Sequence, residues 1–303
     1  MTKYDLVIIG AGPSGYAAAM RALDFRKKVL LIERERVGGA GVTNGALSSK
    51  TWWELSRETS AFRRNLKRFN IEAPSVNYDE IQAEVKSAVR ERKTMLELHM
   101  DQLKDSNYAD LLEFKIGTAK LVGQTEIEIT NGVSKEVVHG DHIILATGSR
   151  PRYLPDLPID EKIVMTSDGI ESMTDFPESM VIVGAGVIGC EYATIFSGFG
   201  RTKVHLIDKG DRILPFEDED VVNIIERNME NKGVLIHRNS KLIRMEIKNE
   251  RVEYELEYDD GGKEIFNVEK ALVSVGRIPN YESLWDDSVD IKIDRRGVED
   301  NDT

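Results

Sequence analysis

The chain has 303 residues and a net charge of −12, with 41% hydrophobic and 31% charged residues, so it can form one large or two ordinary globular domains. Its acidity argues against nonspecific binding to nucleic acid or to membrane surfaces. It contains neither an apolar run of membrane-spanning length nor a basic, apolar leader. Its one cysteine, Cys190, excludes an intramolecular disulfide. We therefore expect a soluble, cytoplasmic protein without a nucleic-acid or membrane partner.

The first 33 residues predict a strand, a glycine turn, a helix and a returning strand. The short β-branched run Leu6 to Ile9 is typical of a buried parallel strand. Gly10, Gly12 and Gly15 then form G-x-G-x-x-G, in which the glycines permit a tight turn, close approach of a pyrophosphate and close helix packing. The free N–H groups at the start of the helix suit phosphates. This pattern predicts a dinucleotide-binding unit.

An acidic residue, Glu33, follows the returning strand Val29 to Ile32. A carboxylate at this place can accept hydrogen bonds from the ribose hydroxyls of an adenosine. Because the strands, the helix and the acid occur together, a glycine turn without a ligand is the less favoured interpretation.

Residues 179–208 repeat this pattern. The strand Met180 to Val183 precedes Gly184, Gly186 and Gly189, and a helix is expected from about Cys190 to Phe199. Two such units predict two bound dinucleotides. Cys190 lies at the start of this helix and is expected to be a small buried residue rather than a nucleophile.

Asp208 ends the second returning strand. An acid at this tip favours NAD, because it binds a 2′-hydroxyl and repels a 2′-phosphate. Lys209 and Arg212 are nearby cations, so NADP stays open as the less favoured coenzyme.

The loop VGGAGVTNGALSSK at residues 37–50 carries a more specific resemblance. The chain resembles the flavoproteins of the dihydrolipoyl dehydrogenase and glutathione reductase type, whose loop reads G-G-T-C-x-N-x-G-C-x-P-S-K. It matches that loop at Gly38, Gly39, Gly45, Ser49 and Lys50. It departs at Gly41 and Ala46, which stand at the two cysteine positions, and at Ser48, which stands at the proline. The redox disulfide of those enzymes therefore cannot form in this chain.

The resemblance implies a catalytic pair. In the family, the lysine of this loop pairs with a glutamate beside N5 of the flavin, and both residues are present as Lys50 and Glu191. The lysine would stabilise negative charge on the flavin, and the glutamate would orient it. Without the resemblance, Glu191 would be read as one half of a surface salt bridge.

The resemblance also implies further cofactor contacts. They are expected at Gly38, Gly39, Lys50, Ala119, Thr147, Gly148, Ser149, Glu191, Leu242 and Gly276. Thr147 and Gly148 belong to an A-T-G segment that closes the flavin domain in the family, and ALVSVGRIPN at 271–280 resembles its return to that domain. Ala119 could equally be an ordinary turn residue.

The predicted fold class is α/β, with two doubly wound, Rossmann-like dinucleotide-binding domains, the second inserted in the first. Residues 1–150 are expected to bind FAD and to be completed by 276–303, and residues 151–275 are expected to bind NAD. Prolines 151, 155 and 158 mark the linker.

Between the motifs, the periodicity predicts further elements. Residues 78–103 carry a helical stripe of Ile81, Val85, Val89, Met95 and Leu98. Strands are expected within 112–129. The segments VLIHR, LIRMEI, VEYELEY and EIFNVEK in 234–276 predict an antiparallel meander with a hairpin at DDGGK.

Other conspicuous residues have ordinary interpretations. Trp52 and Trp53 are expected to pack in a core, with flavin stacking as the alternative. The five histidines, His99, His139, His142, His205 and His237, show no metal-binding spacing and are treated as structural or surface residues.

Two function classes follow. The first is an FAD-dependent NAD(H) oxidoreductase that passes electrons from NADH through the flavin to a non-disulfide acceptor such as a quinone, oxygen, a dye or a second nicotinamide. The second is a redox-silent nucleotide-binding or regulatory homologue. The resembled enzymes continue beyond residue 303 with a second flavin motif and a dimerisation domain, so we expect a fragment of a longer homodimer rather than a naturally short form.

Overall fold

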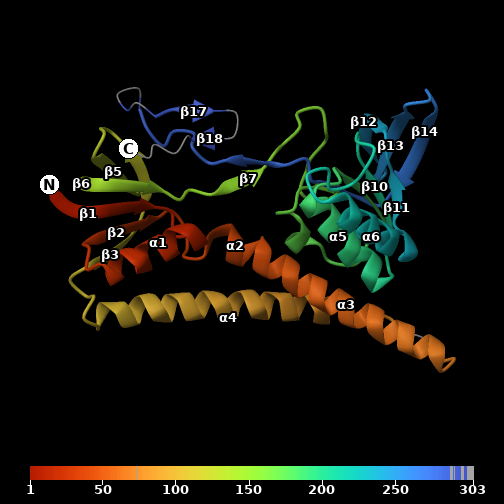
Figure 1. The fold of residues 1–303 in the computed structure, drawn as a ribbon, viewed down its shortest axis with the longest axis horizontal. Coiled ribbons are helices and arrows are strands. Elements are labelled where there is room, and N and C mark those ends of the chain that lie inside the picture. Colours follow the sequence, from red (N-terminus) through yellow and green to blue (C-terminus); the bar gives the residue numbers. More distant parts are fainter. Residues whose placement is uncertain (73, 287–288, 290, 295–296, 299–303) are drawn as a thin grey trace. The chain divides into compact units, whose positions relative to one another are not determined.

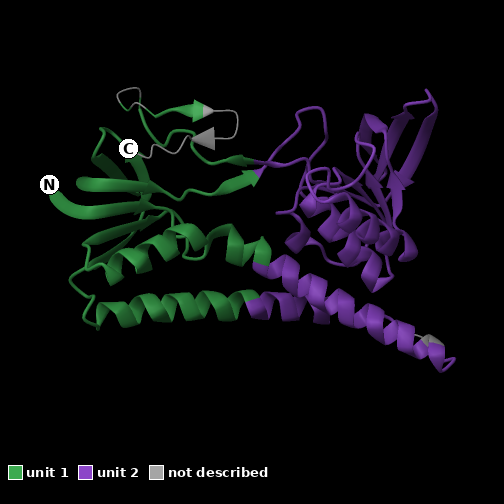
Figure 2. Ribbon diagram, viewed as in Figure 1, with its two compact units in different colours: residues 1–46, 89–150, 278–303 green, residues 47–88, 151–277 purple. Residues whose placement is uncertain are grey.

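The computed structural model describes the chain except residues 73, 287–288, 290, 295–296 and 299–303. The chain forms two compact units, shown in separate colours in Figure 2. Unit 1 comprises residues 1–46, 89–150 and 278–303, and unit 2 comprises residues 47–88 and 151–277. Each unit is described by itself below.

Unit 1 is built on a six-stranded sheet of order β3-β2-β1-β6-β5-β4 (Figure 1). Its strands are β1 (Thr2–Ile9), β2 (Val29–Glu33), β3 (Leu112–Ile116), β4 (Thr118–Leu121), β5 (Glu126–Asn131) and β6 (Ser134–Leu145). The first three strands and β6 are parallel, whereas β5 and β4 add antiparallel pairs at one edge. The order reverses at β1, between β2 and β6, and ligands of open α/β sheets bind at such a reversal.

Unit 2 is built on a five-stranded parallel sheet of order β11-β10-β9-β15-β8. Its strands are β8 (Val164–Met165), β9 (Ser179–Val183), β10 (Lys203–Ile207), β11 (Leu235–His237) and β15 (Lys270–Val273). A separate antiparallel sheet contains β12 (Ser240–Lys248), β13 (Arg251–Tyr258) and β14 (Lys263–Val268). The order again reverses at β9, so unit 2 repeats the topology of unit 1.

Alternation along β9 explains how this central strand is buried on both faces. Met180 and Ile182 belong to one apolar cluster, together with side chains of the helix α5 (Val187–Phe199). Val181 and Val183 belong to another, together with side chains of β13 and β14. Successive side chains of a strand point to opposite faces, and a parallel strand covered on both faces reads as a continuous apolar run.

The remaining elements connect the sheets. The helices are α1 (Pro13–Asp24), α2 (Gly39–Thr43), α3 (Ala46–Arg68), α4 (Tyr78–Lys104) and α6 (Glu219–Asn231), with a 3₁₀ turn at Ile170–Ser172. The chain passes between the units at the start of α3, within α4, within β7 (Ser149–Pro151) and within β16 (Arg277–Pro279). Unit 1 also contains the short hairpin of β17 (Ile293–Asp294) and β18 (Gly297–Val298). The structure therefore confirms the α/β fold with two Rossmann-like units.

The predicted domain ranges and the compact units differ mainly in one long stretch, apart from residues 276–277, which group with unit 2. Residues 47–88, which hold most of α3 and the start of α4, group with unit 2 instead of with the rest of 1–150. The cause is apolar packing, because Trp52, Leu55, Tyr78 and Val85 lie in the same buried cluster as the side chains of α5. The assignment of FAD and NAD to the two ranges stays a prediction.

Two secondary-structure predictions were wrong in detail. The segment VLIHR is not part of the antiparallel meander, because β11 pairs in parallel with β10 as a further strand of the main sheet. The predicted stripe on α4 fails in its second half, where Met95 and Leu98 are 51% and 57% exposed. Leu96 and Met100 are buried in their place. These two lie at positions 11 and 15 after Val85, close to whole turns of a helix with 3.6 residues per turn.

Two of the five histidines lie together in unit 2. The rings of His205 on β10 and His237 on β11 are stacked 5.3 Å apart, and a nitrogen of one lies 3.1 Å from a nitrogen of the other. Burial, followed by the neighbouring His237, lowers the pKa of His205 to about 4. Burial also lowers the pKa of His237, whose other nitrogen lies 2.8 Å from the Tyr258 hydroxyl. The described residues contain no cluster suited to a metal ion.

This buried pair predicts acid sensitivity. His205 has a pKa of about 4 when folded against 6.5 as the unperturbed value, so the unfolded chain binds the extra proton. The contribution of His205 to the free energy of unfolding is therefore fully present above pH 6.5. It is lost as the pH drops toward 4, by up to about 3 kcal/mol. We expect His205→Phe to lose most of this dependence in urea unfolding. The exposed His142→Phe is the control, and equal pH slopes in all three proteins would contradict the prediction.

Candidate functional site

The glycine turn of unit 1 connects β1 to α1. Gly10 has φ +103°, and a Cβ there would lie 2.3 Å from the carbonyl oxygen of Ala146. A Cβ at Gly15 would lie 1.9 Å from the carbonyl oxygen of Gly10. Both positions therefore require glycine, the first for conformation and space and the second because α1 packs directly on the turn.

Unit 2 repeats this turn between β9 and α5. Gly184 has φ +99°, and a Cβ there would lie 2.7 Å from the carbonyl oxygen of Ser274. A Cβ at Gly189 would lie 2.0 Å from the carbonyl oxygen of Gly184. The residues that close the two turns, Ala146 and Ser274, each follow the strand on the far side of the order reversal, β6 or β15.

The middle glycines leave room for a ligand. Gly12 and Gly186 are the N-cap residues of α1 and α5, and neither supplies a side-chain cap. A Cβ at Gly186 would meet nothing within 4 Å, and one at Gly12 would meet only Gly39 Cα, at 4.0 Å. Free N–H groups at an open helix start suit the phosphates of a dinucleotide.

The two acids have matching positions. A carboxylate oxygen of Glu33 accepts the N–H of Ala11 at 2.7 Å, and a carboxylate oxygen of Asp208 accepts the N–H of Ala185 at 2.6 Å. The second oxygen accepts the N–H of Glu35 at 2.9 Å in unit 1, and that of Gly210 at 2.9 Å in unit 2. Each carboxylate thus holds its glycine turn and keeps lone pairs for ribose hydroxyls.

The sequence-predicted pair Lys50 and Glu191 is brought together in unit 2. The Nζ atom of Lys50, near the start of α3, forms an ion pair with Glu191 Oε1 on α5. The Glu191 side chain is 18% exposed and that of Lys50 is 64% exposed. The carboxylate is therefore held within the unit, while the cation reaches outward.

A third residue, Ser49, joins the pair. Its hydroxyl donates to Glu191 Oε1 at 3.2 Å, and the residue is 5% exposed. Sequence reasoning quoted Ser49 as part of the S-K motif but gave it no role. The contact spans 142 positions, so only the packing of α3 on α5 reveals it.

The loop that resembles the redox loop packs against the first glycine turn. A Cβ at Gly41, one of the two cysteine positions, would lie 2.6 Å from Cγ of Pro13. Gly39 has φ +51°, and a Cβ there would lie 3.0 Å from Gly12 Cα. Gly38, with φ +106°, donates its N–H to the carbonyl of Ala11 at 2.8 Å. The backbone of this loop thus lies beside the glycine turn of unit 1.

The A-T-G segment follows β6 and is tied to the returning chain. The side-chain amide of Asn280 donates to the carbonyl of Thr147 at 3.0 Å, and its backbone N–H donates to that of Gly148 at 2.9 Å. Gly148 has φ +69°, and a Cβ there would meet nothing within 4 Å. Ser149 begins β7. Asn280 is a second residue whose local role only the structure shows.

The remaining predicted cofactor positions are dispersed. Ala119 lies within β4 and is 7% exposed, so it is a strand residue and not a turn residue. Leu242 lies on β12 and packs against the apolar cluster between the two sheets of unit 2. Gly276 follows β15 with φ +105°. The cofactor roles of these residues stay predictions.

Cys190 and Trp52 have packing environments. Cys190 is 5% exposed, its thiol donates to the carbonyl of Ala185 at 3.3 Å, and burial raises its pKa to about 12. Because the thiolate is the nucleophilic form, this residue is chemically inert. Trp52 is 2% exposed and packs edge-on against Phe176 and Phe199, whereas Trp53 is 39% exposed, so the expectation of core packing was wrong for Trp53.

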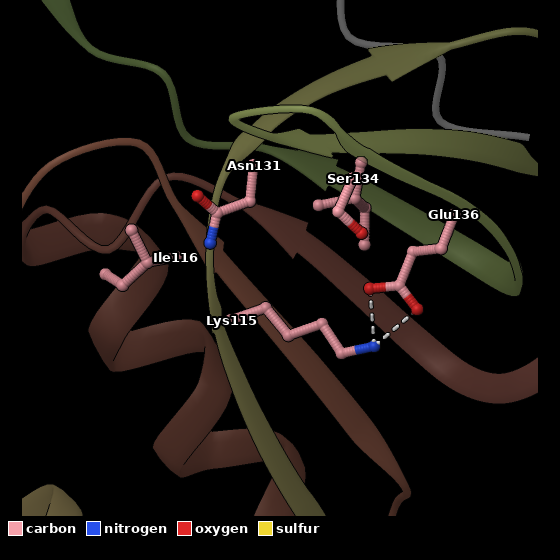
Figure 3. A pocket seen from close by; sticks show the side chains of 6 residues that line it. Lys115, Ile116, Asn131, Ser134 and Glu136 are labelled. Atoms are coloured by element: carbon pink, nitrogen blue, oxygen red, sulfur yellow. Dashed lines mark hydrogen bonds and ion pairs between the residues drawn. The ribbon is translucent and has the colours of Figure 1, made fainter.

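A surface hollow of about 290 Å³ lies elsewhere on unit 1 (Figure 3). It is lined by Lys115, Ile116, Ile129, Asn131, Ser134 and Glu136. Lys115 Nζ lies 2.8 Å from both carboxylate oxygens of Glu136, so the charges there are already paired. No residue of either glycine turn lines this hollow.

The chain is similar to known oxidoreductases in sequence. A family model described as pyridine nucleotide-disulphide oxidoreductase matches residues 4–303. The dihydrolipoyl dehydrogenase of Bacillus subtilis (strain 168) is 33% identical over 298 residues, which cover 96% of this chain and 62% of that protein. The soluble pyridine nucleotide transhydrogenase of Hahella chejuensis is 35% identical over 242 residues, covering 79% and 50%. The chain thus spans 50–62% of the length of these relatives.

Solved structures share the fold. LpdA from Mycobacterium tuberculosis gives a TM-score of 0.83 at 24% identity, covering 98% of this chain and 63% of that one. The Cu(II) complex of the HOCl-induced flavoprotein disulfide reductase RclA from Escherichia coli gives 0.79 at 22% identity, covering 98% and 62%. None of the helices in the described part of the chain is long and apolar enough to cross a membrane. The repeated glycine turns, the shared fold and the family match together show that the chain belongs to the pyridine nucleotide-disulphide oxidoreductase family, whose members use FAD and a pyridine nucleotide.

Proposed function

We propose that the protein is an FAD-dependent NAD(H) oxidoreductase that transfers electrons from NADH through the flavin to an acceptor other than a disulfide. The observation that carries this proposal is the duplicated site. Each unit has a glycine turn whose first and third glycines have no space for a side chain, an open helix start and a terminal acid bonded to the turn. Two such sites suit two dinucleotides.

The turn of unit 1 is assigned to FAD. Gly10, Gly12 and Gly15 would admit the pyrophosphate to the start of α1, and Glu33 would hold the adenosine ribose. The loop at Gly38 and the segment at Thr147 would approach the same cofactor with their backbone. A bound flavin would accept a hydride from a nicotinamide and pass the electrons to an acceptor.

The turn of unit 2 is assigned to NAD rather than NADP. Asp208 would accept from a ribose 2′-hydroxyl and repel a 2′-phosphate. The guanidinium of Arg212 donates to the carbonyls of Pro215 at 2.7 Å and Glu217 at 3.3 Å, so this cation is engaged by the backbone of its own loop. Lys209 is the remaining candidate for binding a 2′-phosphate among the two cations noted in the sequence.

Lys50 and Glu191 are assigned to the hydride transfer. The ammonium of Lys50 would stabilise the negative charge that develops on the flavin, and Glu191 would orient the ammonium. Ser49 would in turn hold the carboxylate through its hydroxyl. None of the roles proposed for Lys50, Glu191 and Ser49 requires a thiol.

The residues of the loop at 37–50 support an electron acceptor other than a disulfide. Gly41 and Ala46 stand where the family has its two cysteines, and Cys190 is buried in α5. A disulfide relay is therefore absent from this chain. The transhydrogenase relatives make a second nicotinamide one of the candidate acceptors, beside a quinone, oxygen or a dye. A homodimeric full-length form and a cytoplasmic location stay predictions.

Anaerobic addition of NADH tests this function against a redox-silent homologue. The purified protein should be yellow, and NADH should bleach its flavin absorption, with reoxidation by an added acceptor. A protein that binds NADH without bleaching would favour the redox-silent alternative, for which the absence of both loop cysteines is the supporting observation.

Glu33→Ala should weaken flavin retention. The variant removes the proposed ribose acceptor and leaves the N–H of Ala11 without its 2.7 Å partner. Charged hydrogen bonds of this kind contribute roughly 1.5–3 kcal/mol, or about 10- to 150-fold in the dissociation constant. The ratio of flavin to protein absorbance after gel filtration measures the effect. The exposed neighbour Glu35→Ala is the control, and equal occupancy in both variants would remove Glu33 from the site.

A further inference from the structure

Helix α3 contacts α5 at a series of points within unit 2. Beyond the Lys50–Glu191 ion pair, the hydroxyl of Ser56 donates to the carbonyl of Ile195 at 2.7 Å, and Ser56 is 2% exposed. Further along, the guanidinium of Arg63 donates to the carbonyl of Phe199 at the end of α5. The two helices are therefore joined at several points.

The backbone of α5 at Gly198 lies directly beside Ser56. A Cβ at Gly198 would lie 2.1 Å from Ser56 Oγ, 3.4 Å from the Ser56 carbonyl oxygen and 3.5 Å from Ser56 Cβ. An alanine could be admitted only if Ser56 turned away from Ile195, and a larger side chain would meet the backbone of α3 as well. Glycine is unfavourable within a helix, so its presence here is explained by this approach.

This contact lies on the same two helices as the ion pair. Ser56 is six residues beyond Lys50, or about 9 Å along α3, and Gly198 is seven residues beyond Glu191, or about 10.5 Å along α5. Packed helices transmit displacement because the interior is close to crystal density. A change in the separation of the helices at Ser56 and Gly198 would therefore be transmitted toward Lys50 and Glu191.

We propose that Gly198 is a positioning residue: because it has no side chain, it lets α3 lie close to α5 beside Ser56 and so sets the geometry of the Lys50–Glu191 pair for flavin reduction. This inference rests on the proposed function, because it concerns the pair assigned to hydride transfer. Neither Gly198 nor Ser56 belongs to a glycine turn or to the S-K motif, and neither was singled out from the sequence.

Gly198→Val tests the inference by forcing the helices apart, and Ser56→Ala is its matched control, since it removes the Ser56–Ile195 bond without adding volume. In Gly198→Val, we expect the flavin reduction rate at saturating NADH to fall about tenfold, as expected for a small misplacement. The dissociation constant for NADH should not change. Ser56→Ala should lower the melting temperature and keep the wild-type reduction rate.

The second readout does not depend on turnover. Reductive methylation of Lys50, followed by mass spectrometry and normalised to the exposed Lys241, reports whether the ammonium is paired. Labelling in Gly198→Val should rise toward that of Glu191→Gln, whereas Ser56→Ala should label like the wild type. If Gly198→Val fails to fold, Ser56→Val applies a smaller pressure from the α3 side and should give the same pattern.

If Lys50 in folded Gly198→Val is labelled as in the wild type, the inference is wrong. It is also wrong if labelling of Lys50 rises in this variant while the flavin reduction rate stays at the wild-type value. The proposed function fails separately, if Lys50→Met itself reduces its flavin at the wild-type rate. In that case the labelling still reports whether the two helices position the pair.

Discussion

Lys50→Met should lower the rate constant of flavin reduction at saturating NADH by about 100-fold, the size seen when one preorganised donor is removed from a developing negative charge. Catalysis needs interactions that are stronger in the transition state than in the ground state. The charge grows on the flavin as the hydride arrives, so the loss should appear in the reduction rate and not in NADH binding. Stopped-flow bleaching at several NADH concentrations separates the two quantities.

Two further variants complete this experiment, one at the partner of Lys50 and one at an exposed lysine of α4. Glu191→Gln should also slow reduction, because it removes the negative charge that pairs with the ammonium of Lys50, while its amide oxygen can still accept from the Ser49 hydroxyl. Lys86→Met removes an exposed lysine of α4 whose contact is Gln82, and should leave the rate unchanged. Wild-type reduction by Lys50→Met would show that this pair has no role in the step.

Asp208→Ala should raise the dissociation constant for NADH by about 10- to 150-fold, the equivalent of roughly 1.5–3 kcal/mol for a charged hydrogen bond. Asp208 accepts the N–H groups of Ala185 and Gly210, so its loss removes both the ribose acceptor and the brace of the glycine turn. The rate of flavin reduction at saturation should stay nearly normal, since the proposed role of Asp208 is to hold the adenosine and not to act at the reacting ring.

A charge-preserving comparison sharpens this test. Asp208→Glu keeps the carboxylate and should lose less affinity than Asp208→Ala. The preference for NADH over NADPH should fall in the alanine variant, because the group that repels a 2′-phosphate is gone. Unchanged NADH affinity in Asp208→Ala, or a preference for NADPH in the wild type, would contradict the assignment of NAD to unit 2.

The dinucleotide-binding units could be predicted from the sequence because their determinants are local. The run Leu6 to Ile9, the glycines after it and Glu33 lie within one strand–helix–strand segment, where backbone sterics and strand burial dictate the conformation. The DDGGK hairpin is local in the same sense, and the structure has β13 and β14 paired across it. The absence of a redox disulfide followed from composition alone.

Features that depend on distant contacts needed the tertiary structure. The parallel pairing of β11 depends on its neighbour β10, because an alternating pattern does not say which strand lies beside it. The buried face of α4 is likewise decided by what it packs against, as Leu96 and Met100 show.

The candidate site also combines locally determined features with features that depend on distant contacts. Residue types in the sequence identified Lys50 and Glu191 only through a resemblance, since 141 positions separate them. Packing of α3 on α5 brings them together, adds Ser49 and leaves little space for a side chain at Gly198. Local backbone preferences thus determined the two glycine turns, whereas the charges and hydroxyls assigned to the proposed chemistry were placed by close packing between helices far apart in the chain.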